Sequence, residues 1–432
     1  MAKFPQTGIL NRPPEQALLF ALRFLPGLDV PTCRTAMEHL REAERRELES
    51  DVDSIDEATD KSVPFPETGE LGFKDGFNRS FLTITTGLSA SAMDRLGVPA
   101  EQRPADLGSV PWADLGLVPI VADPGDILVQ LCTDSPFVAE HAQRRIELAL
   151  AGSVETIWAV RGDQRFTSRQ GRVHGGEARA LIGFHDGTAN LDPVHAEDDR
   201  RLVFVDPNPE ALATYPVTPP AGPQPPPQPG QPGYGSGGLG PIFPPMRPAP
   251  SHEPSWCREG TYCFVQAITM DLGSWDRTAL STQEQVVGRF KRSGASLDLA
   301  DDDARRKEEP AFAASPALET VGVASHLRKT NPRAVAEDLM RRVFRRGYPL
   351  IISDGVGPTR RGLLFQSFSR STSTQIEFIL KAWMFNKDFP RPGVGNDALI
   401  AFFSATLCGG YFFVPGLSHR NDPTSWVLPP ES

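Results

Sequence analysis

Residues 181–190 read Leu-Ile-Gly-Phe-His-Asp-Gly-Thr-Ala-Asn and are the most informative stretch of this chain. Two apolar residues lead into a glycine-bounded loop that holds Asp186 between Phe184 and Gly187. Glycine is used where the backbone turns tightly or where another group approaches it closely. An aspartate fixed in such a loop beside an aromatic ring indicates chemistry rather than a contribution to solubility.

The composition indicates a globular protein with an acidic charge balance. Hydrophobic residues make up 39% of the 432 residues, charged residues make up 23%, and the formal net charge is -10. Because binding to phosphates needs clustered lysine and arginine, we expect no nucleic-acid partner. The first residues, Met1–Thr7, lack the basic patch and apolar run of a signal peptide, so we expect a cytoplasmic protein.

The cysteines and one long uncharged run bear on compartment and membrane association. The five cysteines are widely spaced and form no Cys-x-x-Cys pair, which argues against a disulfide framework or a zinc site and favours a reducing compartment. The uncharged run Leu399–Leu417 is long enough to cross a bilayer, but glycine, proline and hydroxyl residues interrupt it. We therefore expect no membrane association and predict a buried β-hairpin at Phe402–Phe413 that turns at Gly409-Gly410.

Short apolar runs alternate with helical patterns along the first half of the chain. The predicted strands are Ala17–Phe24, Ile127–Leu131 and Thr156–Val160, and the predicted helices are Thr35–Glu49 and Phe137–Ala151. This alternation favours an α+β fold in which helices pack on one face of a sheet.

A change of composition divides the chain into three segments. Proline and glycine runs between residues 206 and 257 can maintain neither a helix nor a central strand, so we predict an extended insertion without a partner. The predicted domains are residues 1–205, which carry the Asp186 loop, and residues 258–432. The latter domain repeats the alternation, with strands at Tyr262–Ile268 and Val343–Ile352, a helix at Gln375–Phe385 and a capping box, Ser281–Glu284, that starts a helix ending at Phe290.

His326 has the most distinctive context of the eight histidines. Imidazole is the usual axial ligand of haem peroxidases. The same residue could instead be a hydrogen-bonding group near a helix start, with Asn331 as the cap and Pro332 in the first turn. Spacing alone leaves both interpretations open.

Several segments together resemble the dye-decolorizing peroxidases, a family of haem enzymes. The Gly-x-x-Asp-Gly pattern at Gly183–Gly187 resembles the family's signature loop, and Ser325–Arg333 resembles its proximal-histidine motif. Further similar segments, in the family's order, are Glu177–Leu181, Met270–Arg277, Gln285–Arg289, Gly362–Phe365 and Asn386–Ile400. The resemblance, which is to the longer cytoplasmic members, implies one haem b per chain. It also implies two ferredoxin-like halves with antiparallel sheets and packed helices, as in a dimeric α+β barrel.

The resemblance assigns roles to single residues. His326 would bind the haem iron, and Asp186 would lie on the opposite face of the haem. Strand alternation places Arg345 on one face with Val343 and Gly347, where its guanidinium needs a polar or anionic partner. By resemblance Arg345, in preference to Arg346, is the distal arginine.

The remaining haem-site residues are also implied by the resemblance. Leu363 and Phe365 would shape the distal wall, and Glu377 would accept a hydrogen bond from His326, because Ser371 occupies the position where relatives often carry aspartate. The set of predicted cofactor-binding residues is completed by Gly183, Phe184, Gly187 and Thr188.

The implied chemistry is reduction of hydrogen peroxide. Asp186 would move the proton from one peroxide oxygen to the other, and Arg345 would stabilise the developing charge, leaving a ferryl-oxo haem. Because a free aspartate has a reference pKa of about 3.9, we expect an acidic activity optimum. Small aromatic or dye-type donors would be oxidised through surface radicals, for which Tyr348, Trp383 and Tyr411 are candidates.

Two other hypotheses compete with this one. A haem-binding protein for haem transfer or iron release would need His326 but not Asp186 together with Arg345. A divalent-cation loop around Asp186 and Asp192 lacks the regular carboxylate spacing of a calcium site. The sequence leaves the oligomeric state open, including a homo-oligomer.

Overall fold

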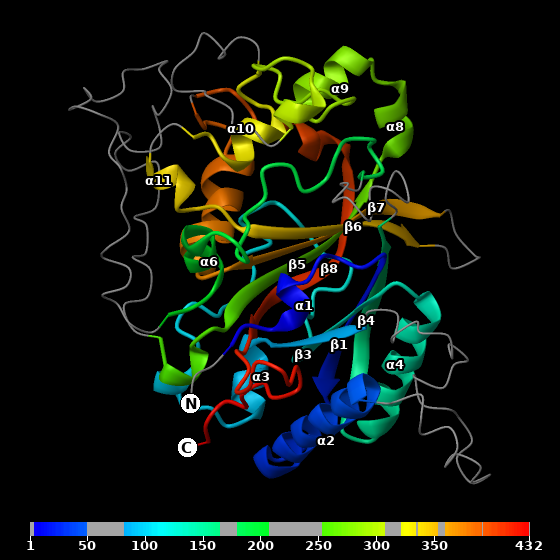
Figure 1. The fold of residues 1–432 in the computed structure, drawn as a ribbon, viewed down its shortest axis with the longest axis vertical. Coiled ribbons are helices and arrows are strands. Elements are labelled where there is room, and N and C mark those ends of the chain that lie inside the picture. Colours follow the sequence, from blue (N-terminus) through cyan, green and yellow to red (C-terminus); the bar gives the residue numbers. More distant parts are fainter. Residues whose placement is uncertain are drawn as a thin grey trace.

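The structure is a computed structural model that describes residues 4–49, 82–164, 179–206, 253–306, 321–333, 336–352, 359–390 and 392–431. Within these ranges, eight antiparallel strands close into one barrel in the order β1-β3-β2-β8-β5-β7-β6-β4 (Figure 1). The strands are β1 (Gln16–Phe24), β2 (Thr83–Leu88), β3 (Ile127–Thr133), β4 (Val154–Asp163), β5 (Thr261–Met270), β6 (Phe344–Ile352), β7 (Arg360–Ser369) and β8 (Phe403–Val414).

The barrel consists of two halves with the same topology. The first half has the strand order β4-β1-β3-β2 and the second has β8-β5-β7-β6. In each half the first and second strands and the third and fourth strands are separated by helical segments, so each follows the ferredoxin-like β-α-β-β-α-β pattern. The predicted α+β fold with two ferredoxin-like halves is therefore confirmed.

The helical segments cover the outside of the barrel. The α-helices are α1 (Thr7–Leu10), α2 (Val30–Glu49), α3 (Ala90–Arg95), α4 (Pro136–Ala149), α6 (Glu197–Val203), α8 (Leu272–Arg277), α9 (Leu280–Val287), α10 (His326–Thr330) and α11 (Ala336–Leu339). Two π-helical segments are η8 (Thr372–Ile376) and η9 (Ile379–Met384), and the 3-10 turns are η4 (Ala100–Gln102), η5 (Ser255–Cys257), η6 (Asp303–Arg305) and η10 (Ala398–Phe402).

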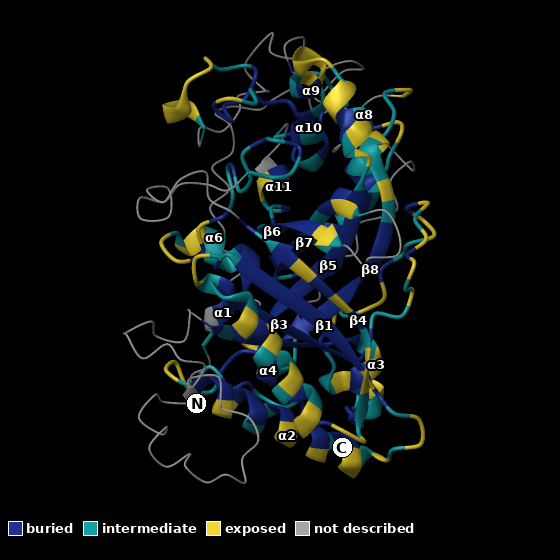
Figure 2. Cartoon of the chain, turned by 90° about the vertical axis from the view of Figure 1, so that its right-hand side faces the viewer, coloured by how far each residue is buried: buried dark blue, intermediate teal, exposed yellow. Residues whose placement is uncertain are grey.

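Strand alternation sends apolar side chains both into the barrel and outward. Leu19 of β1, Val265 of β5 and Leu364 of β7 belong to one cluster that fills the barrel. Leu18 and Phe20 of β1 face the other way and pack with residues of α2, α3 and α4. Figure 2 shows the result, a buried layer of strands with exposed residues on the outer sides of α2 and α4. The first half is thus sealed by helices on its outer face.

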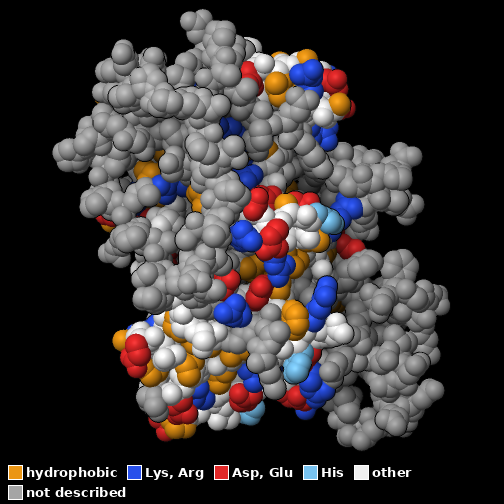
Figure 3. Space-filling view, turned by 60° about the vertical axis from the view of Figure 1, so that its left-hand side comes forward, with side chains coloured by type: hydrophobic (Ala, Val, Ile, Leu, Met, Phe, Trp, Pro, Cys, Tyr) orange, Lys and Arg blue, Asp and Glu red, His pale blue; other side chains and the backbone are white. Residues whose placement is uncertain are grey.

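The outer face of the second half is covered differently. A separate apolar cluster joins Phe264 of β5 and Tyr411 of β8 to Ile376 and Trp383 of the π-helical segments. On the face of the molecule shown in Figure 3, basic and acidic side chains are interspersed among the described residues, with no extended patch of one sign.

The predicted hairpin at Phe402–Phe413 is wrong, because these residues form one continuous strand, β8, preceded by η10. Gly409 and Gly410 do not turn the chain; they pair with Gln266 and Val265 of β5, beside a register shift. A Cβ on Gly409 would lie 2.2 Å from the carbonyl oxygen of Val265, so the glycine permits a close approach of two strands. Within the described ranges, no helix has the length and apolar character needed to cross a bilayer.

The predicted helix start at Ser281 is also wrong. Helix α9 begins at Leu280 without a side-chain cap and ends at Gly288, whose φ is 88°. The capping box does not form, since the Glu284 carboxylate accepts a hydrogen bond from the Lys291 amide instead. Asn331, considered as a helix start, is the residue that ends α10.

Most of the predicted insertion, residues 207–252, lies outside the described residues. Its last residues belong to the folded body. Trp256 is buried, and its indole N–H donates to the carbonyl of Gln102 at 2.7 Å. All five cysteines are buried, and no disulfide joins them.

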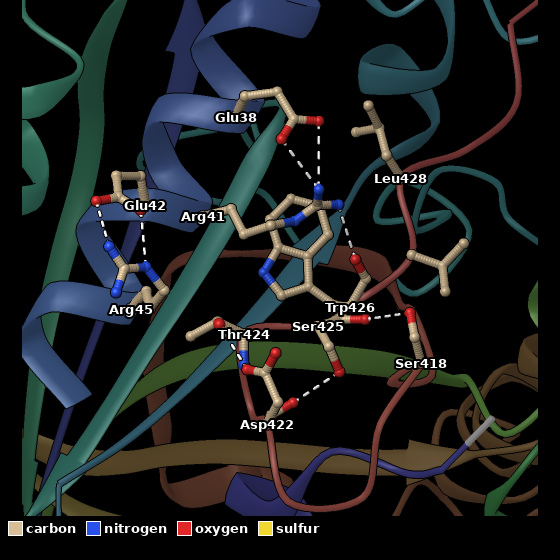
Figure 4. Close-up of a pocket in the computed structure, with 11 residues that line it drawn as sticks. Glu38, Arg41, Glu42, Arg45, Ser418, Asp422, Thr424, Ser425, Trp426 and Leu428 are labelled. Carbon is tan, nitrogen blue, oxygen red and sulfur yellow. Dashed lines mark hydrogen bonds and ion pairs between the residues drawn. The ribbon is translucent and has the colours of Figure 1, made fainter. Parts of the chain in front are cut away.

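The C-terminal segment packs on α2 through Trp426. The Arg41 guanidinium carbon lies 4.5 Å from the centre of the Trp426 ring, and its Nη2 donates to the Trp426 carbonyl (Figure 4). On the other side, the Trp426 indole N–H donates to the buried Glu44 carboxylate at 2.7 Å. Burial raises the pKa of Glu44 to about 7, against the lowering effect of hydrogen bonds from Thr86 and Trp426.

We expect Glu44 to make the stability of the protein depend on pH. Between the ordinary pKa of 4.5 and the folded value of about 7, the folded protein keeps a proton that the unfolded chain has lost. The free energy of unfolding therefore falls as pH rises through this window, by up to about 3 kcal/mol, and stays lower above it. Glu44→Gln mimics the protonated acid, so the difference in the free energy of unfolding between pH 5 and pH 8 should be smaller than in the parent protein. Urea unfolding at the two pH values measures this difference.

The control for this prediction is Glu38→Gln on the same helix, because the Glu38 side chain is 55% exposed. It should leave the pH dependence of unfolding as it is in the parent protein. An equal pH dependence in Glu44→Gln and the parent would contradict the assignment.

Candidate active site

The loop that carries Asp186 is fastened to the second half of the chain. The Arg179 guanidinium donates to the carbonyls of Gly183 and Lys291 at 2.7 Å and to the carbonyl of Arg292 at 2.9 Å. It also contacts His185 Nε2 at 2.7 Å. Burial, with the nearby arginines, lowers the pKa of His185 to about 4. A neutral His185 therefore lies against Arg179 near neutral pH.

Asp186 lies against strand β6. One carboxylate oxygen, Oδ1, accepts a hydrogen bond from the Gly187 amide at 2.7 Å. The other, Oδ2, would be 2.8 Å from a Cβ on Gly347, so a larger residue at that position would displace the carboxylate from where it lies. Gly183 and Gly187 have φ values of 85° and 75°, a region that favours glycine.

Arg345 is tied to the same loop. Its Nη2 donates to the carbonyl of Thr188 at 2.7 Å, and its backbone exchanges two hydrogen bonds with the Asn190 side chain, at 2.8 and 3.0 Å. Arg346 points the opposite way, is buried in the barrel and donates to the carbonyls of Ile9 and Asn11. The structure thus places Arg345, and not Arg346, beside the Asp186 loop.

Leu363 and Phe365 of β7 share this face of the sheet. In the register of β6 and β7, Gly347 lies opposite Phe365, and Pro349 lies opposite Leu363. Directly opposed residues in an antiparallel pair point to the same side. A Cβ on Gly347 would be 3.4 Å from Leu363, which places Leu363 next to Asp186 as well.

His326 forms a second pair of functional groups with Asp397. The ring nitrogen Nδ1 lies 2.6 Å from Asp397 Oδ2, and the Asp397 side chain is completely buried while that of His326 is 31% exposed. Asp397 Oδ1 accepts from the Leu399 amide, which fixes the carboxylate at the start of η10. Among the described residues, none hydrogen-bonds to the other ring nitrogen, Nε2.

Glu377 is not the partner of His326, contrary to our prediction. Its carboxylate instead contacts Lys381 Nζ at 3.2 Å, one turn along the helical segment. Ser371 caps the π-helical segment η8 and donates to Asp106 of the first half. The helical segment therefore directs its acidic side chain to a lysine, and the carboxylate for His326 comes from the loop that follows.

One apolar cluster connects the Asp186 loop to the Asp397 loop. Phe184 is buried and packs edge-on against Trp275, with ring centres 6.1 Å apart. The same cluster contains Ile182 and Leu399, and the Trp275 indole N–H donates to the Ile182 carbonyl at 3.0 Å. Phe184 is therefore a core residue that positions the loop. Trp275 is shared by both loops.

The three aromatic candidates for surface radicals are all buried. Tyr348 points into the barrel, and Trp383 and Tyr411 belong to the cluster outside the second sheet. None of these three residues lies at the surface, so the prediction that they form surface radical sites is wrong.

A metal loop around Asp186 finds no support in the geometry. The Asp192 carboxylate contacts His195 Nδ1 at 3.1 Å. In the part of the chain that the structure describes, no group of three or more His, Cys, Asp or Glu residues could hold a metal ion.

Three positioning residues were missed in the sequence. Asp397 was detectable as an aspartate before an apolar run, a helix-cap signal, within a segment that resembles the family. Asn190 belongs to the quoted loop but has no motif of its own. Arg179 lies in a segment that resembles the family, but two of its three carbonyl partners, Lys291 and Arg292, are more than 100 residues away, so the local sequence does not reveal its role.

A pocket of about 550 Å³ lies elsewhere, between α2 and the C-terminal segment (Figure 4). Its charged side chains pair with one another, Arg41 with Glu38 and Arg45 with Glu42. None of the predicted site residues lines it, and we assign it no function.

Two domains of known proteins match this chain. Residues 30–164 match the N-terminal domain of Dyp-type peroxidases, and residues 246–419 match the C-terminal domain. A deferrochelatase from Escherichia coli strain K12 is 25% identical over 344 residues, which are 79% of this chain and 67% of that protein. A deferrochelatase from Shigella flexneri matches to the same extent.

Solved structures share the fold. A DyP-type peroxidase from Streptomyces coelicolor has a TM-score of 0.68 and 23% identity, covering 96% of this chain and 93% of that chain. Ferric DtpA from Streptomyces lividans gives the same values. DyPB from Rhodococcus jostii RHA1 has a TM-score of 0.58 and 20% identity, covering 99% of this chain and 100% of that chain. At these identities the similarity bears on the fold alone.

We expect Trp275→Phe to loosen the Asp186 loop. The substitution keeps the ring contacts but removes the hydrogen bond to the Ile182 carbonyl, which should cost about 1 kcal/mol or slightly more. Amide hydrogen exchange should become faster at residues 182–187, and urea unfolding should show the loss of stability.

The matched control is Trp383→Phe. Trp383 is also fully buried, but its indole nitrogen has no hydrogen-bond partner among the described residues. Its replacement should leave exchange at residues 182–187 unchanged. Equal exchange rates in both variants would contradict the role given to the Trp275 hydrogen bond.

Proposed function

The chain belongs to the DyP-type peroxidase family, and on this premise we propose that it is a haem-dependent peroxidase that reduces hydrogen peroxide and oxidises small aromatic or dye-type donors. The observation that carries the proposal is the His326–Asp397 hydrogen bond of 2.6 Å. It gives a buried carboxylate to one ring nitrogen and leaves the other for a metal.

The residues present fit a haem group. Histidine ligands of metals usually donate their second N–H to a carboxylate, which fixes the tautomer and makes the ligating nitrogen more basic. With Nδ1 bonded to Asp397, Nε2 of His326 is the nitrogen available to the iron. Bound haem would supply the iron centre at which the peroxide O–O bond is cleaved.

Asp186 is the group proposed to move the proton. The Gly187 amide fixes one of its oxygens, while Oδ2 lies over Gly347 with no hydrogen bond to a described residue. Asp186 would accept the proton from one peroxide oxygen and return it to the other, which leaves as water. Rigid attachment of the loop by Arg179 keeps the carboxylate in one position during both transfers.

Arg345 is the group proposed to stabilise negative charge. The hydrogen bond from its Nη2 to the Thr188 carbonyl orients the guanidinium, and the two bonds between its backbone and the Asn190 side chain fix the residue against the Asp186 loop. A preoriented cation lowers the energy of a transition state in which negative charge develops on the departing oxygen. Leu363 and Phe365, on the same face of the sheet, would limit access to small oxidants.

A second candidate function is release of iron from haem. It is favoured by one observation, the name deferrochelatase carried by curated relatives at 25% identity. Such a function would use His326 but would not need the proton transfer by Asp186. The two functions therefore differ in their dependence on Asp186.

The finer features of the proposal follow from the sequence. We propose one haem b per chain, a cytoplasmic location and the domain boundaries 1–205, 206–257 and 258–432. The donor and the oligomeric state, including a homo-oligomer, are open to experiment.

We expect His326→Ala to abolish stable haem binding. The substitution removes the imidazole that pairs with the buried Asp397 carboxylate, and with it the proposed ligand of the iron. Titration of the variant with haem should give no Soret band typical of histidine ligation. The control is His195→Ala, because His195 is an exposed residue whose loss should leave the spectrum unchanged. A normal Soret band in His326→Ala would refute the ligand assignment.

We expect Asp186→Asn to bind haem normally but to react with hydrogen peroxide about 10²–10⁴-fold more slowly. The rate is measured in a stopped-flow instrument from the change of the Soret band. Asp186→His should restore part of the rate with a pH profile moved toward neutrality, because free histidine has a higher reference pKa than aspartate. Unchanged peroxide kinetics together with the appearance of iron-free porphyrin would favour iron release.

A further inference from the structure

Lys329 is a buried cation whose role no part of the proposed reaction explains. Its side chain is completely buried, three residues after His326 in α10. The ammonium lies 5.6 Å from the centre of the Phe389 ring. A lysine of this kind is rare, since burying the charge is costly unless every N–H finds an acceptor.

All three N–H groups of the ammonium find backbone carbonyls. Nζ donates to Asn386 at 2.8 Å, to Gly395 at 2.7 Å and to Phe389. An ammonium group has three donors and no acceptor, so this set uses its hydrogen-bonding capacity in full. The three carbonyls come from both ends of one loop, residues 386–397, of which residue 391 is not described.

This loop delivers Asp397 to His326. It leaves the π-helical segment η9 at Met384, whose carbonyl accepts a hydrogen bond from the Asp397 amide at 2.8 Å. The Lys329 ammonium therefore joins the first residue of the loop, Asn386, to Gly395 near its end. Without the ammonium, three inward-facing carbonyls would lose their donor, and each buried acceptor left unpaired costs free energy.

The charge of Lys329 also lies in the electrostatic surroundings of Asp397. Burial lowers the pKa of Lys329 to about 8, and the charges of Asp397 and Asp388 oppose this lowering. The lysine is thus mostly cationic near neutral pH. No described carboxylate contacts its ammonium directly, so its hydrogen bonds remain directed at the loop backbone.

We propose that Lys329 is a positioning residue for the proximal pair: it holds the 386–397 loop in the conformation in which Asp397 accepts the hydrogen bond from His326. Lys329 touches neither the iron ligand's ring nor any reacting atom in this assignment. The inference rests on the proposed function in one respect, namely that His326 is the ligand of a haem iron. Its effect on the loop does not depend on haem.

The first test uses the protein without haem. Lys329→Met keeps the length of the side chain and removes all three hydrogen bonds. We expect amide hydrogen exchange in residues 386–397 to accelerate at least tenfold, with little change in the strands of the first half. Unchanged exchange in this loop would overturn the proposal, whatever the protein does with haem.

The second test uses the haem-loaded protein. Loss of a carboxylate partner makes a ligating histidine a weaker donor and favours ferrous iron. Lys329→Met should therefore lower the iron–histidine stretching frequency, in the direction of Asp397→Asn. In the double variant that combines Lys329→Met with Asp397→Asn, the stretching frequency should shift no further than in Asp397→Asn alone. Full additivity of the two shifts would show that Lys329 does not act through Asp397.

The matched control is Lys381→Met. Lys381 is a partly buried lysine of the neighbouring segment η9. Its ammonium pairs with Asp114 and Glu377, and among the described residues it forms no hydrogen bond or ion pair with the loop. It should change neither the exchange of residues 386–397 nor the iron–histidine stretching frequency. A shift equal to that of Lys329→Met would overturn the proposal. If Lys329→Met does not fold, Lys329→Gln, which keeps two donors without the charge, should give a smaller acceleration of exchange in the same loop.

Discussion

Closure of the barrel is the constraint on which the rest of the structure depends. Each four-stranded half alone would leave two strand edges with unpaired backbone groups, which is unfavourable and promotes association. In the barrel the edge strands of the two halves pair with each other. Strand β2 pairs with β8 at Leu88 and Phe413, and β4 pairs with β6 at Gly162 and Leu350. At the second of these pairings a Cβ on Gly162 would come within 2.3 Å of the Tyr348 side chain, so closure requires a glycine there.

Buried apolar side chains pack inside the closed barrel, and the candidate site residues lie outside it. Helices α2 and α4 seal the outer face of the first half. The outer face of the second half receives the Asp186 loop from one direction and the His326 helix with the Asp397 loop from another. On strand β6, Arg346 points into the barrel and Arg345 points to the Asp186 loop.

The cations around the site are paired mainly with backbone carbonyls. Arg179 holds the Asp186 loop, Arg345 binds the Thr188 carbonyl and Lys329 holds the loop that ends at Asp397. A carbonyl accepts a hydrogen bond without neutralising the donor's charge. These hydrogen bonds hold the loops in place, and among the described residues Asp186 forms no ion pair. These cations therefore hold the loops through hydrogen bonds and also keep their positive charge near the site.

Local patterns in the sequence were sufficient to predict the strands and the helix that bury one face. The strands near residues 17–24, 127–131 and 262–268 and the long helix α2 lie where apolar periodicity placed them, because burial of side chains at fixed spacing is a local property of the chain. The motifs around Asp186 and His326 also identified the loop and the helix that carry two of the candidate site residues. The Gly409-Gly410 pair was misread, since a close approach to β5 and a turn both require glycine and the sequence does not distinguish them.

Only the tertiary structure decided which groups meet. Asp397 lies 71 residues beyond His326, and Glu377, nearer in sequence, forms an ion pair with Lys381 instead. The choice depends on how the 386–397 loop folds around Lys329, which no periodicity encodes. Hydrogen bonds between distant segments depend on the path of the backbone through space, whereas the spacing of apolar residues depends on the local repeat of a helix or strand. The sequence was therefore sufficient for the class of fold and the candidate ligand, and three-dimensional packing selected the partner of that ligand.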